Sequence, residues 1–190
     1  TELASHLNAF LEGITETKAP EAPITLEEMI AEGEGDELEF KSSLRWDFKE
    51  QSPNKKLEEV ILKTIAAFAN GQGGTLLIGV DDDGKILGLE GDYHALGGAN
   101  RDKFELHLRN LLNGNLGMAF VTSKIKVAFP LIGESEICQV DIQPSTKPLV
   151  ISVKDKNGQP QEKFYVRSGN SSQELSLNEM QAYLSERFQA

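Results

Sequence analysis

Cysteine is almost absent from this sequence. The 190 residues contain one cysteine, Cys138, so the chain forms no internal disulfide and no zinc site built from several cysteines. Cys138 lies in the alternating segment EICQVDI, a pattern typical of a buried and inert thiol. The low cysteine count predicts a reducing, cytoplasmic setting.

Long apolar runs and grouped histidines are also missing. The longest apolar runs, such as GTLLIGV, are far shorter than the roughly 18 to 20 residues of a membrane-spanning helix. We therefore expect no membrane association. The three histidines, His6, His94 and His107, are too dispersed along the chain to be read as a catalytic or metal-binding triad.

Basic residues are fewer than acidic ones. There are 19 Lys and Arg against 30 Asp and Glu, which gives a net charge of −11. This balance argues against a protein that binds nucleic acid with its whole surface, because phosphate contacts need Lys and Arg. Residues 1–39 contain 11 of the acids and one base, Lys18, which leaves 19 acids and 18 bases elsewhere. The acidity belongs mainly to the N-terminal part.

The sequence pattern divides the chain into residues 1–24 and 25–190. In the first part, ELASHLNAFLEGI places its leucines, Phe10 and Ile14 at helical spacing, which predicts an amphipathic helix that needs a partner surface. TKAPEAP then predicts an extended linker, because proline disfavours helix. A partner for the helix can come from a second copy, so we expect a homodimer.

Residues 25–190 have the pattern of an α+β domain with a mixed, largely antiparallel sheet flanked by helices. ELEFKSSL alternates as a strand with one wet face that carries Glu39 and Lys41. GTLLIGV is apolar on both faces, as a central strand should be. Helices are predicted in TLEEMIAEG, KKLEEVILKTIAAFAN, NRDKFELHLRNLL and LNEMQAYLSERF, and further strands in KILGL, VTSKIKVAF, SEICQVDI, PLVISV and KFYVRSG.

The glycine-rich segment NGQGG resembles a phosphate-binding loop in composition only. Such a loop follows a strand and opens a helix, so that the phosphate meets the N–H groups of the helix N-terminus. Here the order is reversed, and a helix leads into a strand. We expect Gly71 or Gly73 to end the helix with a positive φ and Gly74 to allow close packing, and we do not expect ATP binding.

Acidic residues at two places form a candidate metal site. In DDDGK, Asp82 and Asp83 are typical of a hairpin turn, whereas Asp81 ends a buried strand. In GEGDELEFK, Glu34 lies five residues before Glu39, and Gly33 and Gly35 predict a turn or bulge around Glu34. Two glutamates and one aspartate are the oxygen ligands that Mg²⁺ or Mn²⁺ requires. The residues alone leave a second interpretation open, in which the acids form a solvated face.

Three ordered motifs carry a family resemblance. GEGDELEFKSSL, IAAFANGQGGTLLIGVDDDGKILGL and PLVIS…KFYVRSGNSSQELSLNEM resemble the Schlafen AlbA_2 domain over residues 30–188. Members of this family are described as DNA-binding domains, as ATP-binding proteins and as transcriptional regulators. Some Schlafen proteins are endoribonucleases that cleave tRNA and rRNA.

The resemblance implies roles for particular residues. Glu34, Glu39 and Asp81 match the catalytic and metal-binding carboxylates of the nucleases, with Asp82 as the alternative third residue. Lys41 matches a lysine beside that site. Arg167 matches an arginine that serves either to bind phosphate or to hold a carboxylate in the fold. Gly35 replaces the small hydroxyl residue usual in the family, and the zinc site of the animal proteins is missing.

Basic residues gather late in the chain, and they predict either one nucleic-acid-binding strip or a scattered solvated set. They are Lys124, Lys126, Lys147, Lys154, Lys156, Lys163 and Arg167. Lys41, Lys147 and Arg167 are the candidate nucleic-acid-binding residues.

Two functional hypotheses follow. The first is a module that interacts with RNA or DNA, either as a DNA-binding regulator or as a dimeric endoribonuclease dependent on Mg²⁺ or Mn²⁺. The second is a non-catalytic regulatory domain that binds protein and acts as a dimer.

Overall fold

The computed structural model describes residues 24–98 and 100–188 and is organised around a four-stranded sheet. The strand order is β1 (Leu38–Lys41), β4 (Gly74–Ile78), β8 (Cys138–Ile142) and β5 (Ile125–Ala128). β1 and β4 are parallel, and the other two pairings are antiparallel. The predicted α+β fold with a mixed, largely antiparallel sheet is confirmed.

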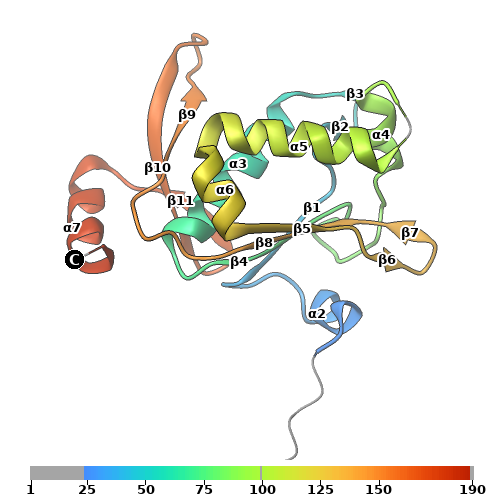
Figure 1. Cartoon of the computed structure of the whole chain (residues 1–190), viewed down its shortest axis with the longest axis horizontal. Helices are drawn as coiled ribbons and strands as arrows, with labels where there is room; N and C mark the ends of the chain where they lie inside the picture. Colours follow the sequence, from blue (N-terminus) through green and yellow to red (C-terminus); the bar gives the residue numbers. More distant parts are fainter. Residues whose placement is uncertain (1–23, 99, 189–190) are drawn as a thin grey trace, which may run out of the picture.

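Helices cover both faces of this sheet (Figure 1). On one side lie α3 (Lys56–Asn70), α5 (Arg101–Leu116) and α6 (Met118–Lys124), which share the larger apolar core with β4 and β8. On the other side, α2 (Leu26–Glu32) inserts Ile30 into a smaller core. Thr25 and Glu28 form the predicted capping box at the start of α2, because each side chain accepts the other's backbone N–H.

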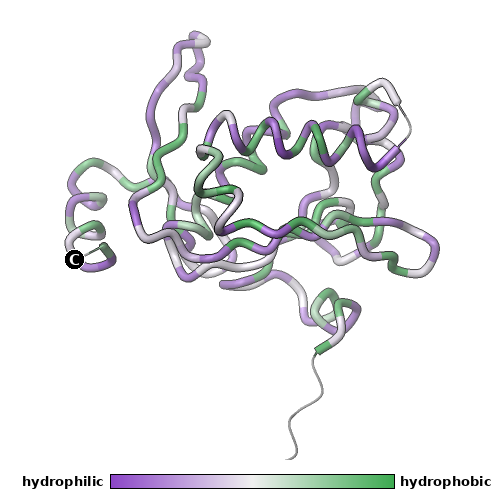
Figure 2. The backbone as a smooth tube through the Cα atoms, viewed as in Figure 1, coloured by the Kyte–Doolittle hydropathy of each residue, from purple (hydrophilic) through white to green (hydrophobic). Residues whose placement is uncertain are grey.

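A second, three-stranded antiparallel sheet packs against α3. It consists of β9 (Val150–Lys154), β10 (Pro160–Ser168) and β11 (Ser171–Glu174). The β9–β10 hairpin projects from the body of the domain, and its outer half is hydrophilic (Figures 1 and 2). Asn70, at the end of α3, donates to the carbonyls of Leu149 and Tyr165 and so joins this sheet to the helix.

The C-terminal helix α7 (Leu177–Arg187) closes the domain beside the end of α3. Tyr183 donates its hydroxyl to the carbonyl of Asn70, and Arg187 donates to the carbonyl of Gly71. These contacts satisfy carbonyl groups that have no partner at a helix C-terminus. Ser176 and Glu179 form the predicted capping box of α7.

Several short elements were not apparent from the sequence. They are β2 (Trp46–Asp47), β3 (Ser52–Pro53), α4 (Glu90–Ala95), β6 (Leu131–Ile132) and β7 (Ser135–Glu136). The strand predicted in VTSKIKVAF begins only at Ile125, because the preceding residues belong to α6. The strand predicted in KILGL is wrong as well, since only Ile86 makes a bridge, to Val80.

The glycines after α3 are architectural, as predicted. Gly73 has a φ of +86°, whereas Gly71 has a φ of −94°. A Cβ on Gly74 would lie 2.5 Å from a ring carbon of Phe68 and 2.8 Å from the carbonyl oxygen of Glu37. The turn therefore brings the start of β4 against α3, with the carbonyl end of the helix facing it.

Two further expectations concern burial and the N-terminal part. Cys138 is fully buried, as predicted, and burial raises the pKa of its thiol well above the ordinary value. The predicted amphipathic helix ELASHLNAFLEGI and the predicted linker TKAPEAP both lie outside the described residues. No helix in the described part of the chain is long and apolar enough to cross a membrane.

Candidate functional site

Glu39 on β1 is buried in an ion pair rather than exposed. Alternation predicted a wet face here, and that prediction is wrong, because Glu39 is only 7% exposed. Its Oε2 lies 2.6 Å from Nη1 of Arg167, which reaches it from β10. Its Oε1 accepts a hydrogen bond from Nζ of Lys41 at 2.5 Å. A buried carboxylate needs such partners, since desolvating it alone is very costly.

Arg167 holds the first motif of the sequence in place. Its side chain is 5% exposed, and its Nη2 donates to the carbonyl oxygens of Gly35 at 2.7 Å and Leu38 at 3.3 Å. The guanidinium also lies 4.8 Å from the centre of the Phe68 ring. Of its two predicted roles, Arg167 therefore takes the one that holds a carboxylate in the fold, and it is not exposed to a phosphate.

Glu34 accepts a hydrogen bond from a backbone N–H group at the edge of the sheet. β1 is an edge strand, and Oε1 of Glu34 accepts the backbone N–H of Phe40 at 2.7 Å. The turn that allows this starts at Gly33, which ends α2 with a φ of +87°. Glu34 thus contacts the backbone next to Glu39.

Asp81 and Asp82 exchange the roles that the sequence predicted for them. Oδ1 of Asp81 accepts the backbone N–H groups of Asp83 at 3.1 Å and Lys85 at 2.9 Å, so Asp81 organises the turn. Asp82 is exposed and lines a cavity together with Lys41. In the turn after β4, the second aspartate and not the first thus lines the cavity.

The predicted carboxylate cluster does not fit a divalent ion. Within residues 24–98 and 100–188, no three His, Cys, Asp or Glu side chains are grouped in a way that could hold a metal. Glu39 is bound by two cations, and Glu34 and Asp81 accept backbone N–H groups. Mg²⁺ requires several free oxygen ligands in nearly octahedral geometry, which these three residues do not supply.

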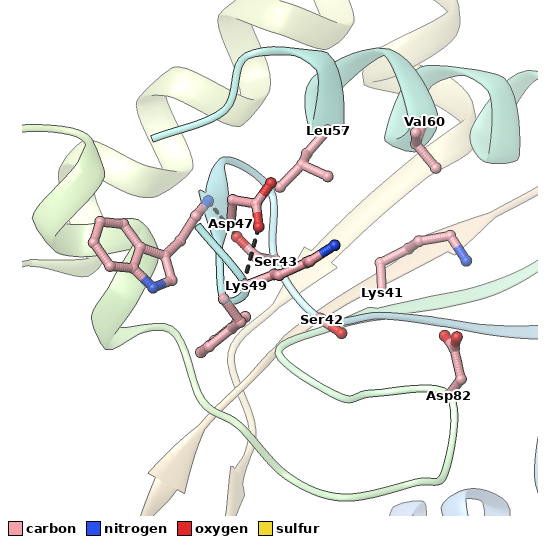
Figure 3. A pocket seen from close by; sticks show the side chains of 10 residues that line it. Lys41, Ser42, Ser43, Asp47, Lys49, Leu57, Val60 and Asp82 are labelled. Carbon is pink, nitrogen blue, oxygen red and sulfur yellow. Dashed lines mark hydrogen bonds between the residues drawn. The ribbon is translucent and has the colours of Figure 1, made fainter. Parts of the chain in front are cut away.

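A cavity of about 290 Å³ lies beside Lys41, between the loop after β1 and the first half of α3. We call it the β1–α3 cavity; it is lined by Lys41, Ser42, Ser43, Trp46, Asp47, Phe48, Lys49, Leu57, Val60 and Asp82. Figure 3 shows Lys41, Lys49 and Asp82 pointing toward one space, with Leu57 and Val60 of α3 on another side. The cavity combines apolar walls with charges of both signs.

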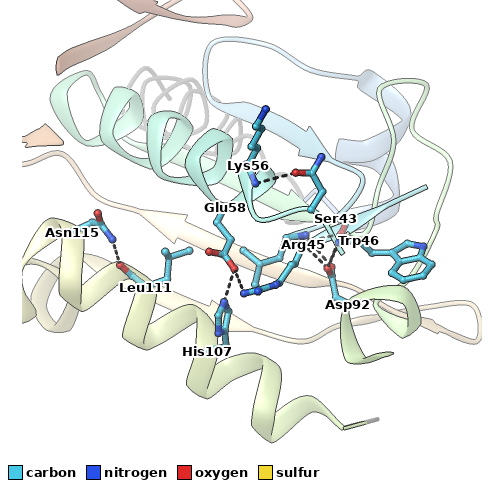
Figure 4. A network of polar contacts seen from close by, with 11 residues as sticks. Ser43, Arg45, Trp46, Lys56, Glu58, Asp92, His107, Leu111 and Asn115 are labelled. Carbon is cyan, nitrogen blue, oxygen red and sulfur yellow. Dashed lines mark hydrogen bonds and ion pairs between the residues drawn. The ribbon is translucent and has the colours of Figure 1, made fainter. Parts of the chain in front are cut away.

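Asp92 fixes the loop that forms one wall of this cavity. It is 1% exposed, and its two oxygens accept the hydroxyl of Ser43 and the N–H groups of Leu44, Arg45 and Trp46 (Figure 4). Burial raises the pKa of Asp92, and these four hydrogen bonds oppose the shift. The loop is therefore held by one buried side chain distant in sequence.

A lysine-rich groove lies on the other side of α3, between α3, α5 and the β9–β10 hairpin. Its first cavity measures about 400 Å³ and adjoins a second cavity of about 260 Å³, because Glu59 and Lys154 line both. We call the two together the lysine groove, after the six lysines that line it: Lys55, Lys56, Lys63, Lys154, Lys156 and Lys163.

The acidic residues of the lysine groove have local partners. Glu58 is buried and binds Arg45 at 2.8 Å and His107 at 2.7 Å (Figure 4). Glu59 pairs with Lys63 at 2.8 Å, and Glu174 pairs with Lys163 at 2.5 Å. Asp155 also lines the groove, and its Oδ1 accepts the backbone N–H groups of Asn157 and Gln159, both at 2.8 Å. No comparable pair, among the residues that the structure describes, involves the other four lysines of the groove: Lys55, Lys56, Lys154 and Lys156.

The sequence of this chain matches a known protein family over most of its length. The family described as "Schlafen, AlbA_2" matches residues 34–176. The chain belongs to the Schlafen AlbA_2 family. The matched range contains Glu34, Glu39 and Arg167. The ion pair between Glu39 on β1 and Arg167 on β10 brings the first and the third of the motifs into contact.

Two solved structures match this chain at low sequence identity, and one of them supports a similar fold. The DIP2311 protein from Corynebacterium diphtheriae matches the whole of this Schlafen AlbA_2 chain at 18% identity with a TM-score of 0.53. This chain spans 34% of that protein's length. The N-terminal domain of a protein from Nitrosomonas europaea, named "Putative ATP-dependent DNA Helicase RecG-related Protein", matches at 22% identity. That match covers 74% of this chain and 82% of the other, and its TM-score of 0.39 is too low to support a common arrangement.

The predicted nucleic-acid-binding residues of this Schlafen AlbA_2 domain do not share one surface. Lys41 lines the β1–α3 cavity, Arg167 is buried, and Lys147 lines a different groove, together with Lys124. Sequence reasoning missed Lys55 and Lys56 because nothing local connects them to the hairpin lysines. Their positions at the start of α3, with Lys55 at the N-cap and Lys56 as the first helical residue, were the available signal.

Proposed function

We propose that this Schlafen AlbA_2 domain is a nucleic-acid-binding module that holds a phosphodiester backbone in the lysine groove. Membership of the family points to a nucleic-acid-related function. The observation that carries the proposal is the group of lysines in this groove that have no acidic partner among the described residues: Lys55, Lys56, Lys154 and Lys156.

The groove has six lysines against four acids, Glu58, Glu59, Asp155 and Glu174, and is thus more basic than the chain as a whole, whose net charge is −11. Its floor includes the apolar side chains of Leu62 and Leu111, and Asn115 and Ser152 add neutral polar groups. Lysine ammonium groups contact phosphates without reading the base sequence, and the release of counterions drives such binding. The groove therefore suits an RNA or DNA backbone in a salt-dependent, weakly sequence-dependent mode.

The proposed activity is binding of nucleic acid without metal-dependent cleavage, because the three candidate metal-binding carboxylates already have partners within the fold. Glu34, Glu39 and Asp81 are occupied by partners within the fold, and no set of metal ligands replaces them in the described residues. We assign these residues structural roles. The homodimer and the protein-binding regulatory function stay predictions from the sequence.

The test is a fluorescence anisotropy titration of the full chain with labelled single-stranded RNA and DNA oligonucleotides at several salt concentrations. If about four phosphates are neutralised, the logarithm of the binding constant falls with the logarithm of salt with a slope of roughly −3, at about −0.7 per phosphate. The double substitution K56E/K154E reduces the magnitude of this slope by more than one and weakens binding of every sequence to a similar extent.

The matched control is K85E/K126E, which changes the net charge by the same amount. Lys85 and Lys126 are exposed, and neither lines the cavity or the groove described above. We expect the control to bind nearly as the parent does, apart from the general effect of its charge. Equal losses in both double variants would show that net charge alone governs binding and would contradict a role for the groove.

A further inference from the structure

We propose that the β1–α3 cavity binds one unpaired nucleotide, with the base against its apolar walls and the phosphate at Lys49. The inference rests on the proposed function for the strand that would deliver this nucleotide. It adds a second site on the opposite side of α3 from the lysine groove, and it names the ligand as a nucleoside monophosphate unit rather than a bare backbone.

The apolar walls of the cavity are open to solvent. Phe48 and Val60 are each 38% exposed, and both line the cavity with Trp46 and Leu57. Exposed aromatic and aliphatic side chains that gather at one hollow mark a binding site for an apolar ring. Bases of single-stranded nucleic acids stack on aromatic side chains in this way.

The polar groups of the cavity match the edge of a base and a phosphate. Asp82 is exposed and supplies a carboxylate acceptor at one side. A carboxylate pairs best with guanine, whose Watson–Crick edge has two adjacent N–H donors. Lys49 is exposed and supplies an ammonium group for the phosphate, and Ser42 adds a hydroxyl. The arrangement favours guanine over other bases.

Neighbouring charges leave these groups available. Asp47 also lines the cavity, but its carboxylate accepts the N–H groups of Lys49 and Glu50 and an amide hydrogen of Asn54. Lys41 directs two of its three ammonium hydrogens to Glu39 and to the carbonyl of Phe40, which leaves one for a ligand. Lys49 is therefore the main cation for the phosphate, and Lys41 is secondary.

The cavity is held in shape before any ligand binds. The loop from Ser43 to Trp46 is fixed through its hydroxyl and backbone N–H groups by the buried carboxylate of Asp92. The opposite wall belongs to α3, the central helix of the domain. A site that is largely preformed loses less conformational freedom on binding.

Trp46 makes the proposal directly measurable. It is the only tryptophan in the 190 residues and it lines the cavity, so the emission of the full chain reports on this site. We expect saturable quenching by GMP, weaker binding of AMP, and much weaker binding of guanosine and of inorganic phosphate. Isothermal titration calorimetry of the same ligands gives an independent measurement.

Three substitutions separate the contributions of the cavity. We expect D82N to lower the affinity for GMP at least fivefold and the affinity for AMP by less. We expect K49A to lower the affinity for GMP toward that for guanosine. F48A lowers the affinity for both GMP and AMP. The control is L106A on α5, because Leu106 is 61% exposed and lies outside the cavity, and it leaves GMP binding unchanged. Circular dichroism of each variant checks that it is folded.

The outcomes distinguish this inference from the proposed function. If GMP gives neither quenching nor heat, or if phosphate alone binds as well as GMP, the nucleotide site is refuted, whatever the oligonucleotide binding. If K56E/K154E abolishes oligonucleotide binding but leaves GMP binding intact, both proposals hold. If GMP binds while no oligonucleotide does, the proposed function fails and the cavity remains a mononucleotide site.

Discussion

Arg167 and Glu39 lie 2.6 Å apart and join the second sheet to the edge strand of the first. Both side chains are at least 90% buried, and Lys41 contributes a second positive charge to the same carboxylate. Removing one partner of a buried ion pair leaves an uncompensated charge, which is strongly destabilising. The pair is therefore a structural junction between the motifs of this family.

We expect R167A to lower the free energy of unfolding by about 3 kcal/mol, at the low end for a buried pair because Lys41 still faces Glu39. R167K retains a charge but cannot also reach the carbonyls of Gly35 and Leu38. Urea unfolding of R167A, E39A and the double variant measures the coupling. Costs that simply add up would show that the two residues do not stabilise one another.

Manganese is expected to leave the thermal midpoint Tm unchanged. A ligand that binds only the folded state raises Tm, but Glu34, Glu39 and Asp81 already have partners within the fold. Differential scanning fluorimetry with Mn²⁺ and with EDTA measures this. A rise in Tm that E39Q removes would demonstrate that Glu39 leaves Arg167 to bind the ion.

Two glycines respond to alanine in opposite directions. At Gly74 a methyl group would collide with Phe68 and with the carbonyl of Glu37, so G74A is expected to lower the free energy of unfolding by about 1 to 3 kcal/mol, as other core overpacking does. At Gly114, inside α5, nothing lies within 4 Å of the added carbon. We expect G114A to gain about 0.5 to 1 kcal/mol from helix propensity. Chemical unfolding that ranks the two the other way round would contradict this geometry.

Glu136 on β7 makes the stability of the fold depend on pH in the acidic range. Partial burial on its own would raise its pKa, but hydrogen bonds from Arg101 and Tyr93 outweigh this and lower the pKa. A carboxyl group whose pKa is lowered on folding stabilises the protein above its ordinary pKa of about 4.3. This contribution is lost as the pH falls through that value and below it.

The variant E136Q tests the acid dependence. We expect it to be less stable than the parent at neutral pH, with the difference shrinking as the pH falls below about 4. E134Q is the matched control, because Glu134 is exposed in the same β6–β7 hairpin and makes no ion pair among the described residues. Unfolding curves at several pH values that differ by a constant amount would contradict the role of Glu136.

Local patterns in the sequence were enough to predict most of the regular elements. Apolar spacing placed α3 and α5, and the pairs Thr25 with Glu28 and Ser176 with Glu179 marked the starts of α2 and α7. Helix periodicity and capping depend on residues within a few positions of each other, so the sequence contains that information directly. The order of the motifs was likewise sufficient for the family.

The tertiary structure decided the site. Glu39 looked exposed because alternation describes one strand, and only the packing of β10 brings Arg167 onto that face. Asp81 and Asp82 are neighbours in sequence, and the turn geometry alone determines which one accepts backbone hydrogen bonds. Lys56 on α3 and Lys154 on β9 line the same cavity only because the second sheet packs against that helix. Long-range contacts of this kind depend on how whole elements pack, which no short segment of sequence encodes.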